Sequence, residues 1–129
     1  MADVNRGNRP LSPFMIGPYY RPQLTSISSI LVRITGIAAL GAALLVVWWL
    51  LAAATSASGF AFIDGLLRSI LGDIVLLGAT WAIFYHMLGR LRHVIWDFGY
   101  CLEVAISEKL AIGMFVGATV LTVLAAILV

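Results

Sequence analysis

Charged residues and cysteine are both scarce in this sequence. Asp, Glu, Lys and Arg make up 11% of its 129 residues, whereas they make up about 25% of an average soluble domain. This scarcity of charge argues against an ordinary water-soluble domain. Cys101 is the only cysteine, so a disulfide within the chain is excluded. The sequence also contains no internal repeat and no low-complexity segment.

Apolar residues take the place of the missing charge. They make up 62% of the chain, and the mean hydropathy is +1.04. An average soluble domain is about 45–50% apolar, so this composition indicates an integral membrane protein that contacts membrane lipid. We expect a few membrane-spanning helices and no separate soluble module. The net charge of +2 says little about partners, and we expect no interaction with nucleic acid.

The apolar residues fall into three stretches, each long enough to cross a bilayer. About 20 apolar residues in a helix cross a hydrocarbon core about 30 Å thick. Thr25 and Ser26 are suitable caps for the first stretch. The sequence therefore predicts an all-α membrane protein with three transmembrane helices over about 26–54, 63–93 and 110–129, a polar break over 55–61 and a polar linker over 97–109.

Residues 1–25 differ from the rest because they hold all four prolines. Repeated prolines remove amide donors and disfavour helix in the residues before them. We expect residues 1–25 to form an irregular N-terminal segment, either a solvated tail or a segment lying on the membrane surface or a partner. Residues 26–129 would then form the membrane domain.

The basic residues predict the orientation of this domain. Arg68 falls on one side of the predicted bundle, and the other seven fall on the opposite side: Arg6, Arg9, Arg21, Arg33, Arg90, Arg92 and Lys109. Basic residues are enriched in cytoplasmic segments. We therefore expect a cytoplasmic N-terminus, a cytoplasmic linker over 97–109 and a C-terminus outside.

Polar residues gather at one level of the predicted bundle. Arg33 lies about two turns into the first span, and His86 lies about two turns before the end of the second. Since these spans run antiparallel, both residues fall in the cytoplasmic third of the bilayer. Ser29 shares a helix face with Arg33, and Arg90 and His93 share one with His86, because residues three, four and seven apart stack on a helix. Ionisable groups at this depth are rare and indicate function.

His86 has two interpretations. A histidine on a membrane helix can be one axial ligand of a b-type haem, or it can simply hydrogen-bond to a neighbouring helix. If haem binds, the second axial ligand must come from another chain, because His93 lies on the same helix and closer to the membrane surface.

Arg33 and Ser29 leave similar alternatives open. A buried guanidinium needs a haem propionate, a quinone carbonyl or another acceptor, unless the side chain snorkels to the interface. Ser29 is a weaker candidate, since a serine in a membrane helix often bonds back to its own backbone.

Three motifs carry a resemblance to a known family. Residues 29–36 (SILVRITG) resemble the S-I-x-H-R-x-[ST]-G signature of the cytochrome b556 subunit of succinate dehydrogenase. Residues 86–100 resemble its second signature, H-x-x-x-G-[IV]-R-H-[LM]-x-[WM]-D-x-G, and residues 9–13 (RPLSP) match its N-terminal motif. The three motifs occur in the family's order, and with the three spans, the topology and the length, the resemblance covers essentially the whole chain.

The chain departs from the family pattern at three places. Val32 stands where the first signature usually has histidine, and Phe14 stands where histidine commonly follows the N-terminal motif. In the second signature the glycine comes one place early, as Gly89, and an extra arginine follows at Arg90. A polar contact near the cofactor or the quinone is therefore expected to be missing at Val32.

The resemblance implies a membrane anchor of respiratory complex II in the cell inner membrane. It implies three partners: a second membrane-anchor subunit, an iron–sulfur subunit and a flavoprotein subunit. By resemblance, His86 is an axial ligand of the iron of haem b, and His93 is a further cofactor-binding candidate. Ser29 and Arg33 would form part of the ubiquinone site, with Arg33 also near a propionate of the haem.

Two alternatives to a succinate:ubiquinone oxidoreductase anchor remain open. A quinol:fumarate reductase anchor would run the reaction in reverse, and the direction depends on the quinone's potential. A haemless structural anchor would use His86 and Arg33 only to pair helices.

Overall fold

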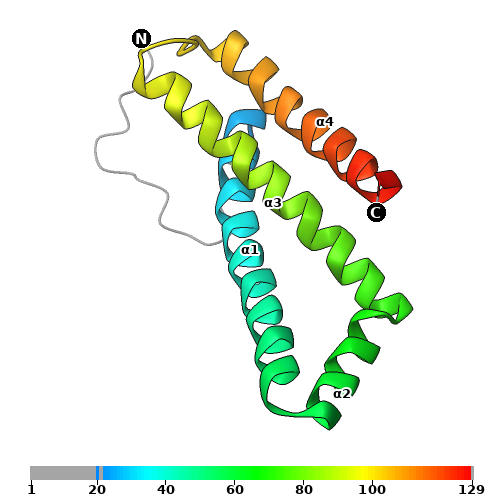
Figure 1. The fold of residues 1–129 in the computed structure, drawn as a ribbon. Coiled ribbons are helices and arrows are strands. Elements are labelled where there is room, and N and C mark those ends of the chain that lie inside the picture. The colour runs from blue at the N-terminus through cyan, green and yellow to red at the C-terminus, as the bar shows by residue number, and fades with distance from the viewer. Residues whose placement is uncertain (1–19, 21, 129) are drawn as a thin grey trace, which may run out of the picture.

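The computed structural model describes residue 20 and residues 22–128, so the expectations for residues 1–19 lie outside the described residues. The described chain forms α1 (Leu24–Thr55), α2 (Ala57–Leu67), α3 (Ile70–Asp97) and α4 (Val104–Leu128) (Figure 1). Three of them, α1, α3 and α4, are long and apolar enough to cross a membrane. The prediction of an all-α membrane protein with three transmembrane helices is therefore confirmed. The sidedness of the termini stays a prediction.

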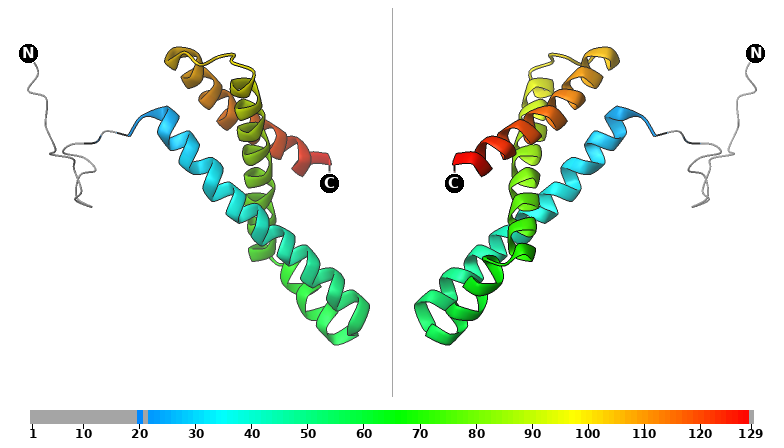
Figure 2. Two further views of the ribbon diagram at one scale, coloured as in Figure 1. Left: turned by 90° about the vertical axis from the view of Figure 1, so that its left-hand side faces the viewer. Right: turned by 90° about the vertical axis from the view of Figure 1, so that its right-hand side faces the viewer.

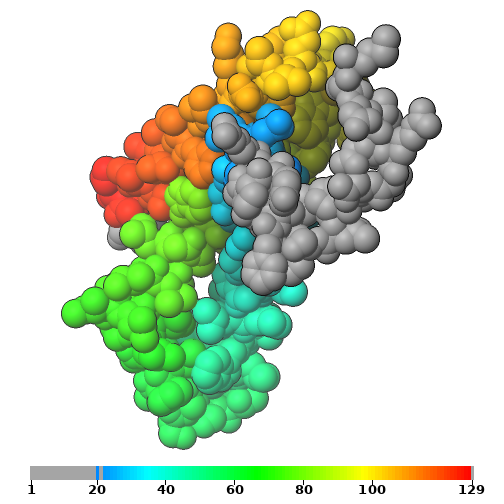
Figure 3. Space-filling view, turned by 180° about the vertical axis from the view of Figure 1, so that it is seen from behind, coloured from blue at the N-terminus to red at the C-terminus, as the bar shows by residue number. Residues whose placement is uncertain are grey.

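Helix α3 is the centre of the arrangement. It packs against both α1 and α4, which touch each other much less. The two further views show α1 crossing α3, while α2 lies beside the C-terminal part of α1 and returns the chain to α3 (Figure 2). Seen from behind, α4 lies away from the part formed by α2 and the neighbouring ends of α1 and α3 (Figure 3). One half of the α1–α3 pair is thus covered by α4, and the other half is braced by α2.

The connection between α1 and α3 is more helical than the sequence predicted. The expected polar break over 55–61 is wrong, because helix resumes at Ala57 and runs to Leu67. Ser56 caps α2 by accepting a hydrogen bond from the Gly59 amide at 3.1 Å. Serine is a favoured helix cap, so this polar stretch begins a helix where we expected a loop.

A second cap separates α2 from α3. The Ser69 hydroxyl accepts a hydrogen bond from the Gly72 amide at 3.2 Å. A Cβ atom at Gly72 would collide with the carbonyl oxygens of Leu66 and Leu67. The corner therefore depends on glycine, and the helix predicted over 63–93 is divided there into α2 and α3.

A glycine turn closes α3. The Gly99 backbone has a φ of 78°, and its amide donates to the Trp96 carbonyl at 2.8 Å while the Tyr100 amide donates to the Ile95 carbonyl at 3.2 Å. This pair of hydrogen bonds is a Schellman motif. Helix α4 then begins at Val104, earlier than the predicted 110, because its first turns extend beyond the apolar stretch into polar sequence.

The core lies where α1, α3 and α4 meet. Val32, Tyr85, Met114 and Ala118 are buried there, and the Tyr85 ring packs edge-on against Phe115 with ring centroids 5.0 Å apart. Away from this junction most large apolar side chains are exposed, which suits helices surrounded by lipid or by other apolar helices.

Candidate functional site

A groove lies between the N-terminal half of α1 and the C-terminal half of α3. Its volume of about 500 Å³ is within the usual range for ligand pockets. We call it the polar groove, and its lining residues are Ser29, Val32, Arg33, Gly36, Ile37, Leu40, His86, Arg90 and His93. The structure thus brings together all four candidate site residues, Ser29, Arg33, His86 and His93. Arg90, which the sequence places on the same helix face as His86, lines the groove with them.

The His86 ring is held by the backbone of α1. Its Nδ1 atom lies 2.8 Å from the Val32 carbonyl oxygen, and a carbonyl oxygen can only accept a hydrogen bond. Nδ1 therefore carries the proton. The Nε2 atom accepts a hydrogen bond from Arg90 Nε at 3.3 Å, which requires a lone pair on Nε2. This is the tautomer that a metal-binding histidine needs, with one nitrogen fixed by a backbone carbonyl and an unprotonated lone pair on the other.

Two glycines let the helices approach closely enough for this contact. A Cβ atom at Gly36 would lie 2.7 Å from His86 Cε1, too close for the ring to stay where it is. On the opposite helix, a Cβ atom at Gly89 would collide with the Val32 side chain. Val32 is thus buried against Gly89 and contributes its carbonyl oxygen to the polar groove.

Arg33 and Ser29 offer unused hydrogen-bonding groups to the polar groove. Arg33 is exposed and Ser29 is half-buried. Neither side chain hydrogen-bonds to any other residue in the described part of the chain. The adjacent Ser28 differs, because its hydroxyl is buried and donates to the Thr25 carbonyl at 2.9 Å. One serine of the pair is therefore structural, and the other faces the groove.

His93 lies at the same groove but makes a different contact. It is half-buried, and its ring meets Trp96 edge-on with ring centroids 5.1 Å apart. His86 is therefore the histidine whose proton position is fixed by α1, and His93 is the second imidazole of the lining.

The sequence analysis missed the role of Arg92. We counted this residue only among the basic residues that predict the orientation, but it is 2% exposed. Its Nη1 atom donates to the Ser28 hydroxyl at 2.8 Å, and the guanidinium lies over the Trp96 ring at 4.6 Å. Helical spacing could have found it, because position 92 shares the face of Tyr85 and Gly89, which is turned away from His86.

The polar groove suits a haem in its donor set. One imidazole with a lone pair on Nε2 can serve as an axial ligand once Arg90 releases that atom, and the guanidinium groups of Arg33 and Arg90 suit carboxylates such as haem propionates. Ile37 and Leu40 provide apolar wall. Within residues 22–128 no three His, Cys, Asp or Glu side chains form a cluster able to hold a metal ion, and an axial histidine does not require one.

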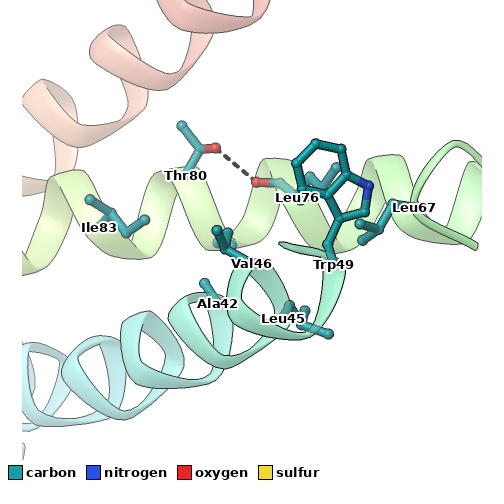
Figure 4. A pocket seen from close by; sticks show the side chains of 9 residues that line it. Ala42, Leu45, Val46, Trp49, Leu67, Leu76, Thr80 and Ile83 are labelled. Atoms are coloured by element: carbon teal, nitrogen blue, oxygen red, sulfur yellow. Dashed lines mark hydrogen bonds between the residues drawn. The ribbon is translucent and has the colours of Figure 1, made fainter. Parts of the chain in front are cut away.

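A second groove lies between the same two helices at their other ends (Figure 4). It has a volume of about 300 Å³ and is lined by Ala42, Leu45, Val46, Trp49, Leu67, Leu76, Ala79, Thr80 and Ile83. The Thr80 hydroxyl donates to the Leu76 carbonyl at 2.8 Å, so it is satisfied within its own helix. We call this the apolar groove, because no charged side chain lines it.

Comparison with known proteins places these features in a family. The sequence model of the succinate dehydrogenase/fumarate reductase transmembrane subunit family matches residues 5–126 of this chain. The chain is 49% identical over 124 residues to a succinate dehydrogenase cytochrome b556 subunit of Paracoccus denitrificans, covering 96% of this chain and 94% of that protein.

More distant relatives carry similar names. Identity is 34% over 116 residues to a succinate dehydrogenase cytochrome b556 subunit of Rickettsia conorii, covering 90% of this chain and 89% of that protein. It is 30% over 127 residues to a succinate dehydrogenase cytochrome b560 subunit of Chondrus crispus, covering 90% of this chain and 92% of that protein. The similarity thus runs through the polar groove and all the membrane-spanning helices.

Proposed function

Because the chain belongs to the succinate dehydrogenase/fumarate reductase transmembrane subunit family, we propose that it is a membrane anchor of succinate:ubiquinone oxidoreductase, complex II. In this proposal it lies in the cell inner membrane with its N-terminus on the cytoplasmic side. It pairs with a second membrane-anchor subunit and holds an iron–sulfur subunit and a flavoprotein subunit at the membrane. The broad exposed apolar faces of its helices are suited to packing against a second membrane-anchor subunit.

His86 is proposed to co-ligate haem b through Nε2. The observation that carries the proposal is the 2.8 Å hydrogen bond from His86 Nδ1 to the Val32 carbonyl. This bond keeps the proton off Nε2 and orients the ring, in a groove that Ser29 and Arg33 also line. The second ligand of the haem iron would come from the other anchor subunit. When bound, haem b supplies a one-electron carrier.

Ser29 and Arg33 are proposed to bind ubiquinone at the same level. The Ser29 hydroxyl can donate a hydrogen bond to a quinone carbonyl oxygen, and no described residue competes for it. Arg33 places a fixed positive charge in the groove, which stabilises the negative charge that quinone oxygens gain on reduction. Full reduction takes two electrons, which succinate oxidation provides, and two protons. In the same proposal Arg33 and His93 also lie near the haem.

A difference spectrum of the assembled complex tests the haem ligand. We expect His86→Ala to lose the b-type reduced-minus-oxidised spectrum, because Nε2 is the coordinating atom. His93→Ala is the matched control on the same helix face, and we expect it to keep low-spin bis-histidine absorption. An unchanged spectrum in His86→Ala would refute the assignment, and a lost spectrum in His93→Ala alone would move it to that residue.

Quinone kinetics test the second half of the proposal. We expect Ser29→Ala and Arg33→Leu to impair succinate:quinone activity while succinate oxidation by a soluble artificial acceptor continues. Loss of one hydrogen bond to a charged group costs about 1.5–3 kcal/mol, or about one to two decades in rate or affinity. Parental rate and KM in both assembled variants would show that quinone binds elsewhere.

A further inference from the structure

Arg90 hydrogen-bonds to Nε2 of His86, the atom through which His86 is proposed to coordinate the haem iron. Its Nε atom donates to His86 Nε2 at 3.3 Å, while His86 Nδ1 is committed to the Val32 carbonyl. A metal ion and the Arg90 guanidinium cannot use the same lone pair. Any coordination through His86 Nε2 therefore requires the Arg90 guanidinium to move to another acceptor.

No carboxylate among the described residues forms an ion pair with Arg90. The polar groove is lined by Arg33, Arg90 and two histidines, but by no Asp or Glu. The ion pair found among the described residues joins Arg68 and Asp64, at the opposite ends of the helices. The guanidinium groups of Arg33 and Arg90 thus line one groove, and no described acidic side chain lines it with them.

The existing hydrogen bond is suited to exchange. At 3.3 Å it is longer than the usual N–H donor distance of about 2.9–3.0 Å, and Arg90 is exposed. A guanidinium–carboxylate contact is charge-assisted, commonly bidentate and roughly twice as strong as a neutral hydrogen bond. An anionic carboxylate in the groove would therefore draw Arg90 away from the neutral imidazole.

We propose that Arg90 is a positioning residue for the haem. When haem binds, the Arg90 guanidinium leaves His86 Nε2 and pairs with a propionate carboxylate. This inference rests on the proposed role of His86 as the haem ligand. The exchange breaks one hydrogen bond and forms one ion pair, with no covalent change. A positive charge held beside the haem favours its reduced form, which carries one more electron, so Arg90 raises the midpoint potential.

The inference is specific to this chain's own sequence. Arg90 is the extra arginine by which residues 86–100 depart from the family signature. Its partner His86 lies four residues earlier on the same face of α3, so the guanidinium contacts Nε2 within the same helix. Arg92, two residues further on, is buried against Ser28 and Trp96 and faces away from the groove.

Redox titration of the haem in the assembled complex is the decisive experiment. We expect Arg90→Gln to keep the bis-histidine absorption but to lower the reduced-to-oxidised ratio about tenfold at a fixed potential. For a one-electron couple this is a fall of about 59 mV in midpoint potential. Arg90→Lys keeps the charge and should recover part of that fall. Arg68→Gln, at the far end of the molecule, should leave the potential unchanged.

Other outcomes separate the inference from the proposal beneath it. If His86→Ala keeps the haem spectrum, both fail. If His86→Ala loses the spectrum but Arg90→Gln has the parental potential, only the role of Arg90 fails. A changed quinone KM with an unchanged potential would make Arg90 a quinone residue and overturn the inference. Lower assembly with an unchanged potential would make it an interfacial anchor. Haem loss in Arg90→Gln that Arg90→Lys reverses would support the inference.

Discussion

The two grooves lie between the same pair of helices, α1 and α3, with Leu67 of α2 added at the apolar groove, and they differ almost completely in chemistry. The polar groove presents two arginines, two histidines and a serine. The apolar groove presents aliphatic side chains, one tryptophan and a threonine that is already hydrogen-bonded. The helix scaffold creates a cavity at each end, and the side chains decide which of them can hold a charged or coordinating ligand.

The two ends also differ in how their polar groups are satisfied. Beside the apolar groove, Asp64 accepts a hydrogen bond from Trp49 Nε1 at 3.2 Å and pairs with Arg68 at 2.8 Å. This carboxylate is fully engaged within the fold. At the polar groove, Arg33 makes no hydrogen bond or ion pair with the described residues. Closed polar interactions stabilise a structure, whereas open ones leave a place for a ligand.

Thiol labelling to determine the orientation of the chain in the membrane should give an all-or-none result. With Cys101 replaced by serine, Ser58→Cys puts a thiol at an exposed position of α2. We expect a membrane-impermeant maleimide to label it in intact cells, because the seven-to-one bias of basic residues predicts that α2 lies outside. Labelling of the native Cys101 in intact cells would instead put the polar groove on the outer side.

Filling the space beside His86 should have the next largest effect. A leucine at Gly36 would displace the His86 ring, since even a Cβ atom would lie 2.7 Å from it. Overpacking costs about 1–3 kcal/mol, so we expect haem affinity to fall by about one to two decades. Gly41→Leu is the matched control on α1, because nothing lies within 4 Å of a Cβ atom there. Equal haem content in both variants would contradict the close approach.

Substitutions of the adjacent residues Ser28 and Ser29 should have different effects, one on stability and the other on quinone binding. Ser28→Ala removes the hydrogen-bond partner of buried Arg92, and leaving a buried polar group without a partner costs about 1–3 kcal/mol. We expect a lower Tm for the solubilised complex with an unchanged KM for quinone. Ser29→Ala should show the reverse. If both variants lose stability equally, Ser29 is a structural residue like its neighbour.

A change in the apolar groove should have the smallest effect. Thr80→Val removes a hydroxyl that bonds only to its own helix. We expect less than a twofold change in quinone KM and no change in haem potential, measured on the assembled complex. A larger change in either quantity would show that the apolar groove also takes part in electron transfer.

The sequence alone determined which helices can cross the membrane and which polar residues share a level. Hydropathy and charge are properties of consecutive residues, so they can be read without knowing how helices pack. The same reading placed the first span over 26–54, close to the observed α1 (Leu24–Thr55). It failed at 55–61, where local serine caps turn a polar stretch into the start of α2.

Only the tertiary structure decided the different roles of residues of the same type that lie close in sequence, such as Arg90 and Arg92. Successive residues are about 100° apart around a helix, so the rotation of α3 against α1 sends Arg90 into the polar groove and Arg92 into the core. It likewise decides that the Val32 carbonyl, rather than any side chain, fixes the proton on His86. That contact joins residues far apart in the chain across a gap that Gly36 keeps open, and no local pattern in the sequence records it.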